Sequence, residues 1–220
     1  ASESEVGGSS ASTSEIKNYI SDAYYNWENP PEIVGLIGDT GGSYSLPNYS
    51  HSWNGYGGPT DFDYTQIYGN DLLADVLIGR ISAEDSDDLN NIINKTIQYE
   101  KGIYQTEAFF KGAALVGDPS QGTGNSAIFT NQYIENIMIN HGFNAHGIGT
   151  YYQSGNADNW VENQFDSGIL FYNYRGFYGS SGINESGFNN GYNNPFVTSL
   201  TCGTGDYDYT SDSESFIQAG

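Results

Sequence analysis

Cysteine and basic residues are scarce in this sequence. The 220 residues include one cysteine, so no disulfide can form within the chain, and cysteine pairing says nothing about its redox compartment. Lysine and arginine total 6 against 27 aspartates and glutamates, which gives a formal net charge of −21. Nucleic acids and anionic membrane surfaces attract proteins through lysine and arginine. We therefore expect neither of them as a partner.

Long apolar runs are also missing, and so is a leader sequence at Ala1. No stretch approaches the length of a membrane-spanning helix, and the first residues lack the apolar region of a signal peptide. We expect a processed protein that is secreted, extracellular or held at the cell surface, without membrane insertion. In such surroundings the acidic residues either keep the protein soluble or supply carboxylates for calcium.

Hydrophobic residues nevertheless make up 37% of the chain, with 19 tyrosines and 11 phenylalanines, which is enough for a folded core. Residues 1–14 are small and polar, and predict a flexible arm. Apolar residues at helical spacing predict a helix from Glu15 to Trp27, which ends before Pro30. We expect residues 15–220 to form one domain.

Short apolar runs alternate with amphipathic segments along the rest of the chain. This alternation predicts an α/β fold of the doubly wound type, with a mostly parallel sheet and helices on both faces. Segments 40–71 and 179–194 are longer than ordinary connections and would leave the carboxyl ends of strands, where such folds bind ligands. The expected strands are 33–37, 76–81, 113–116, 148–152, 169–173 and 196–200, and the expected helices are 82–101, 126–140, 158–165 and one that begins near Ser213.

The sequence stops within or just after that last helix. A further strand would be expected next in an alternating fold. We therefore expect the chain to be a fragment of a longer precursor, with further domains of the same precursor as partners.

Cys202 is the strongest candidate for chemistry. It follows the expected strand 196–200 and precedes Gly203, Thr204 and Gly205, so its thiol would lie at the carboxyl end of a strand on a glycine-rich turn. A nucleophile needs such exposure, and backbone amides of the turn would stabilise an oxyanion. A buried structural cysteine fits the position equally well.

Several motifs occur in a fixed order between residues 33 and 220. They are 38–42 (GDTGG), 71–82 (DLLADVLIGRIS), 95–101 (KTIQYEK), 116–118 (VGD), 173–179 (NYRGFYG) and 201–207 (TCGTGDY), of which the last two are the most specific. Together they resemble the gingipain family of cysteine endopeptidases. The resemblance implies a caspase-like fold, a catalytic Cys–His dyad with Cys202 as its thiol, protein or peptide substrates, and no required cofactor.

One position departs from the family's pattern. The family's histidine follows a glycine, whereas this sequence has Phe177 after Gly176. A phenyl ring cannot transfer a proton, and a free cysteine with a pKa of ~8.5 is only a few per cent thiolate at neutral pH. General acid catalysis toward the leaving amine would also be lost. Two functions therefore stay open: an impaired cysteine-type endopeptidase, and a catalytically dead pseudo-peptidase that serves as an extracellular binding or structural module.

Residues beside these motifs are candidates for supporting roles. Arg175 would either lower the pKa of the Cys202 thiol or form a structural ion pair with a carboxylate. The expected oxyanion donors are backbone amides near Gly176, Phe177 and Cys202, and the expected substrate contacts are Arg175, Gly203 and Asp206.

Three histidines occur elsewhere in the chain, and one of them could substitute for the missing base. His51 lies in segment 40–71, which leaves the carboxyl end of a strand, so it is a candidate surrogate base or else an exposed loop histidine. His141 and His146 precede a strand and would lie at the opposite edge of the sheet.

Two sets of aspartates provide hard oxygen ligands. Their spacing is not that of an EF-hand, so calcium binding and solvated acidic loops both remain open. A carboxylate near the nucleophile would also select basic residues at the cleavage site, although the pattern does not say which one. The first set is Asp61, Asp63, Asp71 and Asp75, and the second is Asp206, Asp208 and Asp212.

Overall fold

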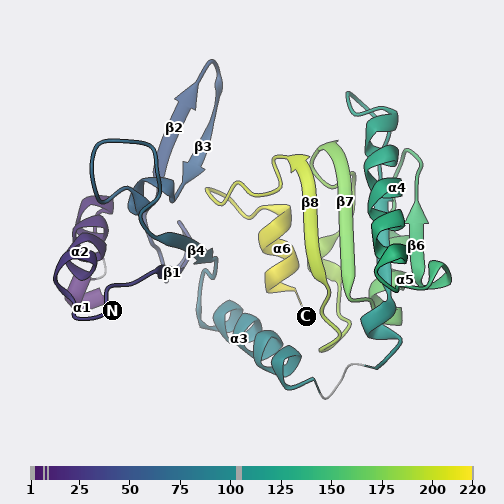
Figure 1. Cartoon of the computed structure of the whole chain (residues 1–220), viewed down its shortest axis with the longest axis horizontal. Helices are drawn as coiled ribbons and strands as arrows, with labels where there is room; N and C mark the ends of the chain where they lie inside the picture. The colour runs from purple at the N-terminus through teal and green to yellow at the C-terminus, as the bar shows by residue number, and fades with distance from the viewer. Residues whose placement is uncertain (1–2, 7, 9, 103–105, 220) are drawn as a thin grey trace. The chain divides into compact units, whose positions relative to one another are not determined.

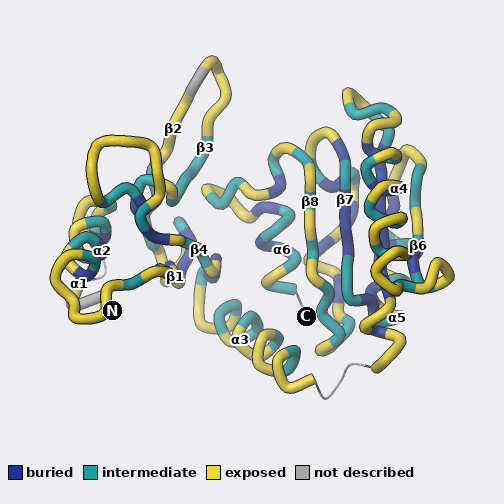
Figure 2. Tube along the Cα trace, viewed as in Figure 1, coloured by how far each residue is buried: buried dark blue, intermediate teal, exposed yellow. Residues whose placement is uncertain are grey.

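The computed structural model describes residues 3–6, 8, 10–102 and 106–219, which belong to two compact units. The first unit runs to Leu89 and includes Asp206–Tyr209, whereas the second comprises Asn90–Gly205 and the residues from Thr210 onward. Figure 1 labels the elements of each unit, and Figure 2 shows their burial. No described helix is long and apolar enough to cross a membrane.

The first unit is built around two parallel strands. β1 (Ile33–Ile37) pairs with β4 (Leu77–Ile81) over all five residues of each strand. Helices α1 (Glu3–Val6) and α2 (Thr13–Asn26) precede β1. The buried residues of this core are Ile16, Ile20, Leu36, Tyr64 and Val76.

The start of α2 corrects the expected boundary of the arm. Ser12 caps the helix: its hydroxyl accepts from the Glu15 amide at 3.3 Å, while the Glu15 carboxylate accepts from the Ser12 amide at 2.8 Å. This reciprocal arrangement is a capping box, which satisfies amides that have no partner inside the helix. Val6 and Ala11 also pack against the core, so the segment predicted as an arm through residue 14 contributes structure.

The long segment 40–71 contains a β-hairpin that the sequence reading missed. β2 (Tyr49–Trp53) and β3 (Tyr56–Thr60) pair antiparallel, and Asn54 and Gly55 join them with φ of 52° and 81°. Asn-Gly is the preferred pair for a two-residue hairpin turn, because both positions need positive φ. A short 3-10 turn, η1 (Phe62–Thr65), follows β3.

The second unit holds a four-stranded parallel sheet. Its order is β6-β5-β7-β8, with all three pairings parallel. The central strand β5 is apolar and fully buried, as expected for a parallel sheet covered on both sides. The strands are β5 (Ala113–Gly117), β6 (Ile148–Tyr151), β7 (Phe171–Tyr178) and β8 (Phe196–Cys202).

Helices cover both faces of this sheet. α4 (Asn125–Asn140) packs against the face that carries Leu115, whereas α5 (Asp158–Ser167) packs against the face that carries Val116. Successive residues of a strand point to opposite faces, so the two helices lie on opposite sides. Phe216 of α6 (Asp212–Gln218) packs on the α5 side, and α3 (Ser86–Lys101) crosses the boundary between the units.

The predicted α/β class with parallel strands and helices on both faces is confirmed, with two corrections. The described parallel strands form a four-stranded sheet and a separate two-stranded sheet, not one sheet. β7 begins at Phe171 and continues to Tyr178, five residues beyond the expected 169–173. The motif 173–179 therefore lies mainly on a strand, with an irregular register between Arg175 and Tyr178.

Candidate active site

Cys202 is the last residue of β8, at the carboxyl edge of the four-stranded sheet. It pairs with Tyr178 at the end of β7, and its carbonyl accepts from the Gly179 amide at 2.9 Å. The thiol is exposed. The alternative of a buried structural cysteine is therefore wrong, and the side chain is accessible to a substrate or to an alkylating reagent.

The turn after Cys202 depends on a glycine. Gly203 has a φ of 79°, and a Cβ built there would lie 2.8 Å from Cζ of Tyr178. The Tyr178 ring therefore lies against the backbone of the thiol's turn. Sequence reasoning missed Tyr178, although two aromatic residues in succession at a strand end place one ring on each side of the strand.

Phe177 has a different neighbour from Tyr178. A Cβ built on Gly122, in the loop between β5 and α4, would lie 2.6 Å from Cε2 of Phe177. The phenyl ring thus lies against the Gly122 backbone and is 51% exposed. It supplies an apolar surface at this edge and no group that can accept a proton.

Arg175 donates to backbone carbonyls. Its Nη1 donates to the Leu200 oxygen at 2.7 Å and to the Gly176 oxygen. No ion pair to Arg175 occurs within residues 3–6, 8, 10–102 and 106–219, so the expected carboxylate partner is replaced by the carbonyls of its own edge. The guanidinium ties β7 to β8 just before Cys202.

A hydroxyl–carboxylate chain lies at the carboxyl end of β5. The Tyr174 hydroxyl donates to Ser181 Oγ at 2.8 Å, and Ser181 Oγ donates to Asp118 Oδ2. The Ser120 amide donates to Asp118 Oδ1 at 2.8 Å. Burial alone would raise the pKa of Asp118, but the hydrogen bonds from Ser181 and Ser120 outweigh it and lower the pKa. Asp118 is thus held as a carboxylate, which braces loop 179–183 against the sheet.

Two glycines lie close to the backbone amides that we expect to stabilise an oxyanion: Gly176 and Gly179. A Cβ on Gly176 would lie 2.6 Å from the Tyr174 hydroxyl, so a larger residue there would displace the hydroxyl chain. The Gly179 amide is already used by the Cys202 carbonyl. Donation by amides at Gly176, Phe177 and Cys202 stays a prediction.

Comparisons with known proteins bear directly on this arrangement. The model of peptidase family C25 matches residues 2–220. The chain belongs to this family. Gingipain R2 of Porphyromonas gingivalis is 32% identical to it over 163 residues, which are 68% of this chain and 22% of Gingipain R2. Gingipain R1 of the same species is 32% identical over 161 residues, 67% of this chain and 16% of that protein.

Solved gingipain structures share the fold. The crystal structure of the Arg-specific cysteine proteinase gingipain R (RgpB) matches 99% of this chain and 51% of that chain, with a TM-score of 0.79 and 26% identity. The complex of Porphyromonas gingivalis RgpB pro- and mature domains gives a TM-score of 0.81 at 26% identity, over 100% of this chain and 53% of that chain. The predicted caspase-like α/β fold is confirmed, and the chain spans about half of these structures.

Two of the three histidines, His141 and His146, belong to the second unit and lie at the edge of its sheet opposite to the thiol. His141 follows α4 and His146 lies in η3 (Ala145–Gly147), so both precede β6 at the amino edge of the sheet. Parallel strands end together at the opposite edge, where Cys202 lies. His51, on β2 in the first unit, is exposed, and its Nε2 is 2.8 Å from Asp63 Oδ2. An aspartate that orients an imidazole is a feature of general bases, although that contact does not place His51 near a thiol.

The aspartates of segment 40–71 have protein partners. Asp61 forms an ion pair with Arg80, and Asp63 contacts His51. The Asp71 carboxylate accepts from the Leu73 amide at 2.9 Å. Amides of Tyr68 and Ile67 donate to Asp75 and lower its pKa. Within the described residues no group of three or more His, Cys, Asp or Glu side chains converges in a way that could hold a metal ion. Calcium binding stays a prediction.

The remaining predicted residues lie in or near the turn. Asp206 belongs to the first unit and its Oδ1 accepts from the Asp208 amide at 3.3 Å, whereas Asp212 accepts from the Ser180 hydroxyl at 2.7 Å in the second unit. Substrate contact by Arg175, Gly203 and Asp206 stays a prediction.

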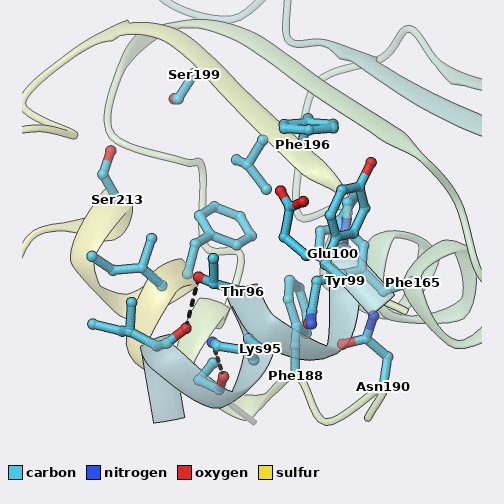
Figure 3. A pocket seen from close by; sticks show the side chains of 17 residues that line it. Lys95, Thr96, Tyr99, Glu100, Phe165, Phe188, Asn190, Phe196, Ser199 and Ser213 are labelled. Carbon is cyan, nitrogen blue, oxygen red and sulfur yellow. Dashed lines mark hydrogen bonds between the residues drawn. The ribbon is translucent and has the colours of Figure 1, made fainter. Parts of the chain in front are cut away.

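A separate cavity of about 450 Å³ lies in the second unit, among α3, α6 and β8 (Figure 3). Its walls are mainly aromatic and aliphatic, and Lys95 is the one cation among its lining residues. Lys95 Nζ donates to the Ala219 carbonyl, and burial lowers the pKa of Lys95 to about 8. Cys202, Arg175 and Phe177 do not line this cavity, so it is distinct from the thiol edge.

Proposed function

We propose that this chain carries a cysteine-type endopeptidase site in which Cys202 is the nucleophile and which is impaired because Phe177 replaces the dyad histidine. The observation that supports this function most is the exposed thiol at the end of β8, on a turn opened by Gly203, in a family C25 chain. RgpB is described as Arg-specific. The proposed substrates are accordingly extracellular proteins or peptides cleaved after a basic residue.

The proposed reaction is acyl transfer to the thiol. The Cys202 thiolate attacks the scissile carbonyl, and the tetrahedral oxyanion collapses to a thioester as the amine departs with a proton taken from solvent water. A second water then attacks the thioester, which releases the carboxylic acid and restores the thiol. Nothing at the Phe177 position supplies the proton to the leaving amine, which removes a contribution of roughly 10²–10⁴-fold. Turnover is therefore expected to be slow and limited by acylation.

Hydrolysis of an arginine peptide with a fluorogenic amide leaving group tests the proposal. Wild type should turn over slowly, Cys202→Ala should abolish turnover, and Phe177→His should raise kcat/KM by about 10²-fold or more. Hydrolysis that persists in Cys202→Ala would rule out the thiol as the nucleophile. His141→Ala is a matched control, because His141 lies at the amino edge and should leave the rate unchanged.

A pseudo-peptidase is the second candidate, supported by the phenyl ring that stands where the family's pattern has a histidine. Phe177 lies against Gly122 and has no group that can transfer a proton, and the ring of Tyr178 lies against Gly203. A module of this kind would bind proteins or have a structural role outside the cell. Absence of turnover in both wild type and Phe177→His, with Cys202 still readily alkylated, would favour this second function.

Location, further domains and calcium belong to the same proposal. The acidic surface and the family suit a protein that is secreted or held at the cell surface, within a longer precursor whose other domains are partners. Calcium would support assembly of the acidic loops, and no other cofactor is required. A melting temperature that is the same with and without a chelator would contradict the calcium proposal.

A further inference from the structure

The cavity among α3, α6 and β8 has the size of a small-molecule site. All of its lining residues belong to the second unit. Its volume of about 450 Å³ falls within the range of roughly 300–1,000 Å³ that is usual for such sites. Aromatic side chains from several elements form much of its wall (Figure 3): Tyr99, Phe165, Phe188, Phe196 and Phe216.

These aromatic side chains are held by contacts with one another. The Phe188 ring centroid lies 4.8 Å from that of Phe165 and 5.8 Å from that of Phe216. Tyr99 and Phe196 form a second pair, edge to face, with centroids 5.4 Å apart. Rings that already pack on their neighbours lose little further freedom when a ligand binds. The cavity is therefore suited to a ligand with a flat apolar part.

Lys95 lines this cavity without a counter-charge. Its Nζ donates to the Ala219 carbonyl, and no carboxylate among the described residues forms an ion pair with it. A carboxylate would be easy to supply in a chain with 27 acidic and 6 basic residues. Glu100 also lines the cavity, but it is exposed and does not pair with Lys95.

The Lys95 ammonium has spare hydrogen-bonding capacity. Burial lowers the pKa of Lys95 to about 8, so most of the side chain is still charged at neutral pH. An ammonium has three N–H donors, and the Ala219 carbonyl takes one of them. A desolvated ammonium with donors to spare is attractive to an anion that enters the cavity.

Two further polar groups on the wall have no partner among the described residues. Asn194 Nδ2 and Ser199 Oγ are buried, and neither makes a hydrogen bond. Leaving a buried polar group unpaired is costly, and proteins keep such groups where a ligand or a water molecule completes them. Together with Lys95 they give an otherwise apolar cavity several donors for a ligand that carries oxygen acceptors.

We propose that this cavity binds a small aromatic carboxylate, with its ring against the aromatic walls and its carboxylate on the Lys95 ammonium. Such a ligand supplies the counter-charge that the chain does not, in a desolvated setting where charge-assisted hydrogen bonds are strong. A cation that is held at a cost to the fold is typical of a residue kept for binding. The proposal does not depend on Cys202 or on peptidase activity.

4-Phenylbutyrate and its neutral amide, 4-phenylbutanamide, are suitable probes. They have nearly the same shape and differ in charge, so the ratio of their dissociation constants measures the contribution of the carboxylate. Isothermal titration calorimetry at pH 7 should show saturable binding of the acid at one site, about tenfold tighter than the amide or more. No saturable binding of the acid, or equal binding of the two probes, would overturn the proposal.

Lys95→Met identifies the group that holds the carboxylate, because it removes the charge and keeps the apolar stem. The acid should then bind about tenfold more weakly or worse, and the amide should be little affected. Lys101→Met is the matched control: it removes the same charge from the same helix, and Lys101 does not line the cavity. A preference for the acid that survives Lys95→Met, or that is lost equally in Lys101→Met, would overturn the role of Lys95.

Thr96→Trp tests whether the probes enter the cavity itself. Thr96 lines the cavity from an exposed position of α3, so the larger side chain reduces the space without changing the core. Both probes should bind about tenfold more weakly or worse, and unchanged binding of both would overturn the site. None of these measurements requires turnover, so the failure of the peptidase proposal and the failure of this one are separate results.

Discussion

At the scale of single residues, desolvated groups in this protein are stabilised to very different extents. Arg80 is buried and uses all five donors. Lys95 is half-buried in an apolar cavity, and its ammonium donates to one carbonyl, that of Ala219. Burying a charge is costly unless hydrogen bonds or a counter-charge replace its hydration. Arg80 should therefore support the fold, whereas Lys95 should weaken it.

Lys95→Met should stabilise the protein at neutral pH by on the order of 1–3 kcal/mol, because a desolvated ammonium is removed and the apolar stem is kept. The pKa of Lys95 is lowered from 10.5 to about 8 by burial. The wild-type cost is full below pH 8 and disappears as the pH rises to 10.5, so the two proteins should converge over that range. Urea unfolding at several pH values measures this difference, with the exposed Lys101→Met as control. A destabilised Lys95→Met would show that the ammonium contributes more than its desolvation costs.

Asp118→Asn should destabilise the protein at pH 7 by about 1–2 kcal/mol, since the carboxylate accepts from Ser181 and from the Ser120 amide. Hydrogen bonds hold the pKa of Asp118 below its ordinary value against the effect of burial. Its contribution is present above the pKa of the unfolded chain and is lost as the pH falls through the lower folded pKa. The gap between wild type and variant should therefore close in acid. Asp166→Asn, at an exposed position of α5, is the control, and a gap that stays constant down to pH 2 would contradict this account.

At the scale of elements, local signals set several boundaries sharply. The capping box of Ser12 and Glu15 starts α2, and the same arrangement of Ser211 and Glu214 starts α6. Asn54-Gly55 sets the hairpin β2–β3. Each of these devices was present in the sequence, and each acts through contacts within a few residues. Because the residues of each cap or turn are close together in the chain, these element boundaries could have been predicted from the sequence.

Ser12→Ala should lower the stability of the first unit by about 1 kcal/mol, because the Glu15 amide loses its acceptor. Ser14→Ala, two residues into the helix and exposed, should cost little, since alanine is the better helix former. Thermal unfolding followed by circular dichroism compares the two variants. Equal midpoints for Ser12→Ala and Ser14→Ala would mean that α2 does not depend on its cap.

At the scale of the whole molecule, repulsion among the acidic side chains is the main long-range effect on stability. A net charge of −21 on 220 residues destabilises any compact state through self-repulsion, and few basic residues are available to compensate. Among the described residues, Arg80–Asp61 and Lys111–Glu107 form ion pairs, and His51 contacts Asp63. Most carboxylates must therefore be stabilised by amides, hydroxyls and solvent ions.

Sodium chloride should therefore stabilise the protein. At 1 M salt the Debye length falls to about 3 Å, and exposed carboxylates no longer repel one another over distance. The melting temperature should rise by about 2–5 °C between 10 mM and 1 M sodium chloride. Scanning calorimetry measures the shift, with an equal osmolality of sucrose as control. A melting temperature that falls with salt would mean that attractive ion pairs outweigh repulsion.

The sequence by itself determined the α/β class, the positions of most strands and helices, and the place of Cys202 after a strand. Apolar runs and helical periodicity are properties of neighbouring residues, so they can be read without the fold. The family motifs also sufficed to identify the caspase-like architecture.

Tertiary structure alone decided which side chains meet. Phe177 against Gly122, Tyr178 against Gly203 and Tyr207 above Arg80 are contacts between residues remote in the chain or set by a strand register. The sequence analysis ended this strand at residue 173, because the parallel pairing with β8 that extends β7 to Tyr178 involves residues more than twenty positions away. Such contacts depend on which distant segments of the backbone pack together, and the secondary-structure propensity of neighbouring residues does not determine this.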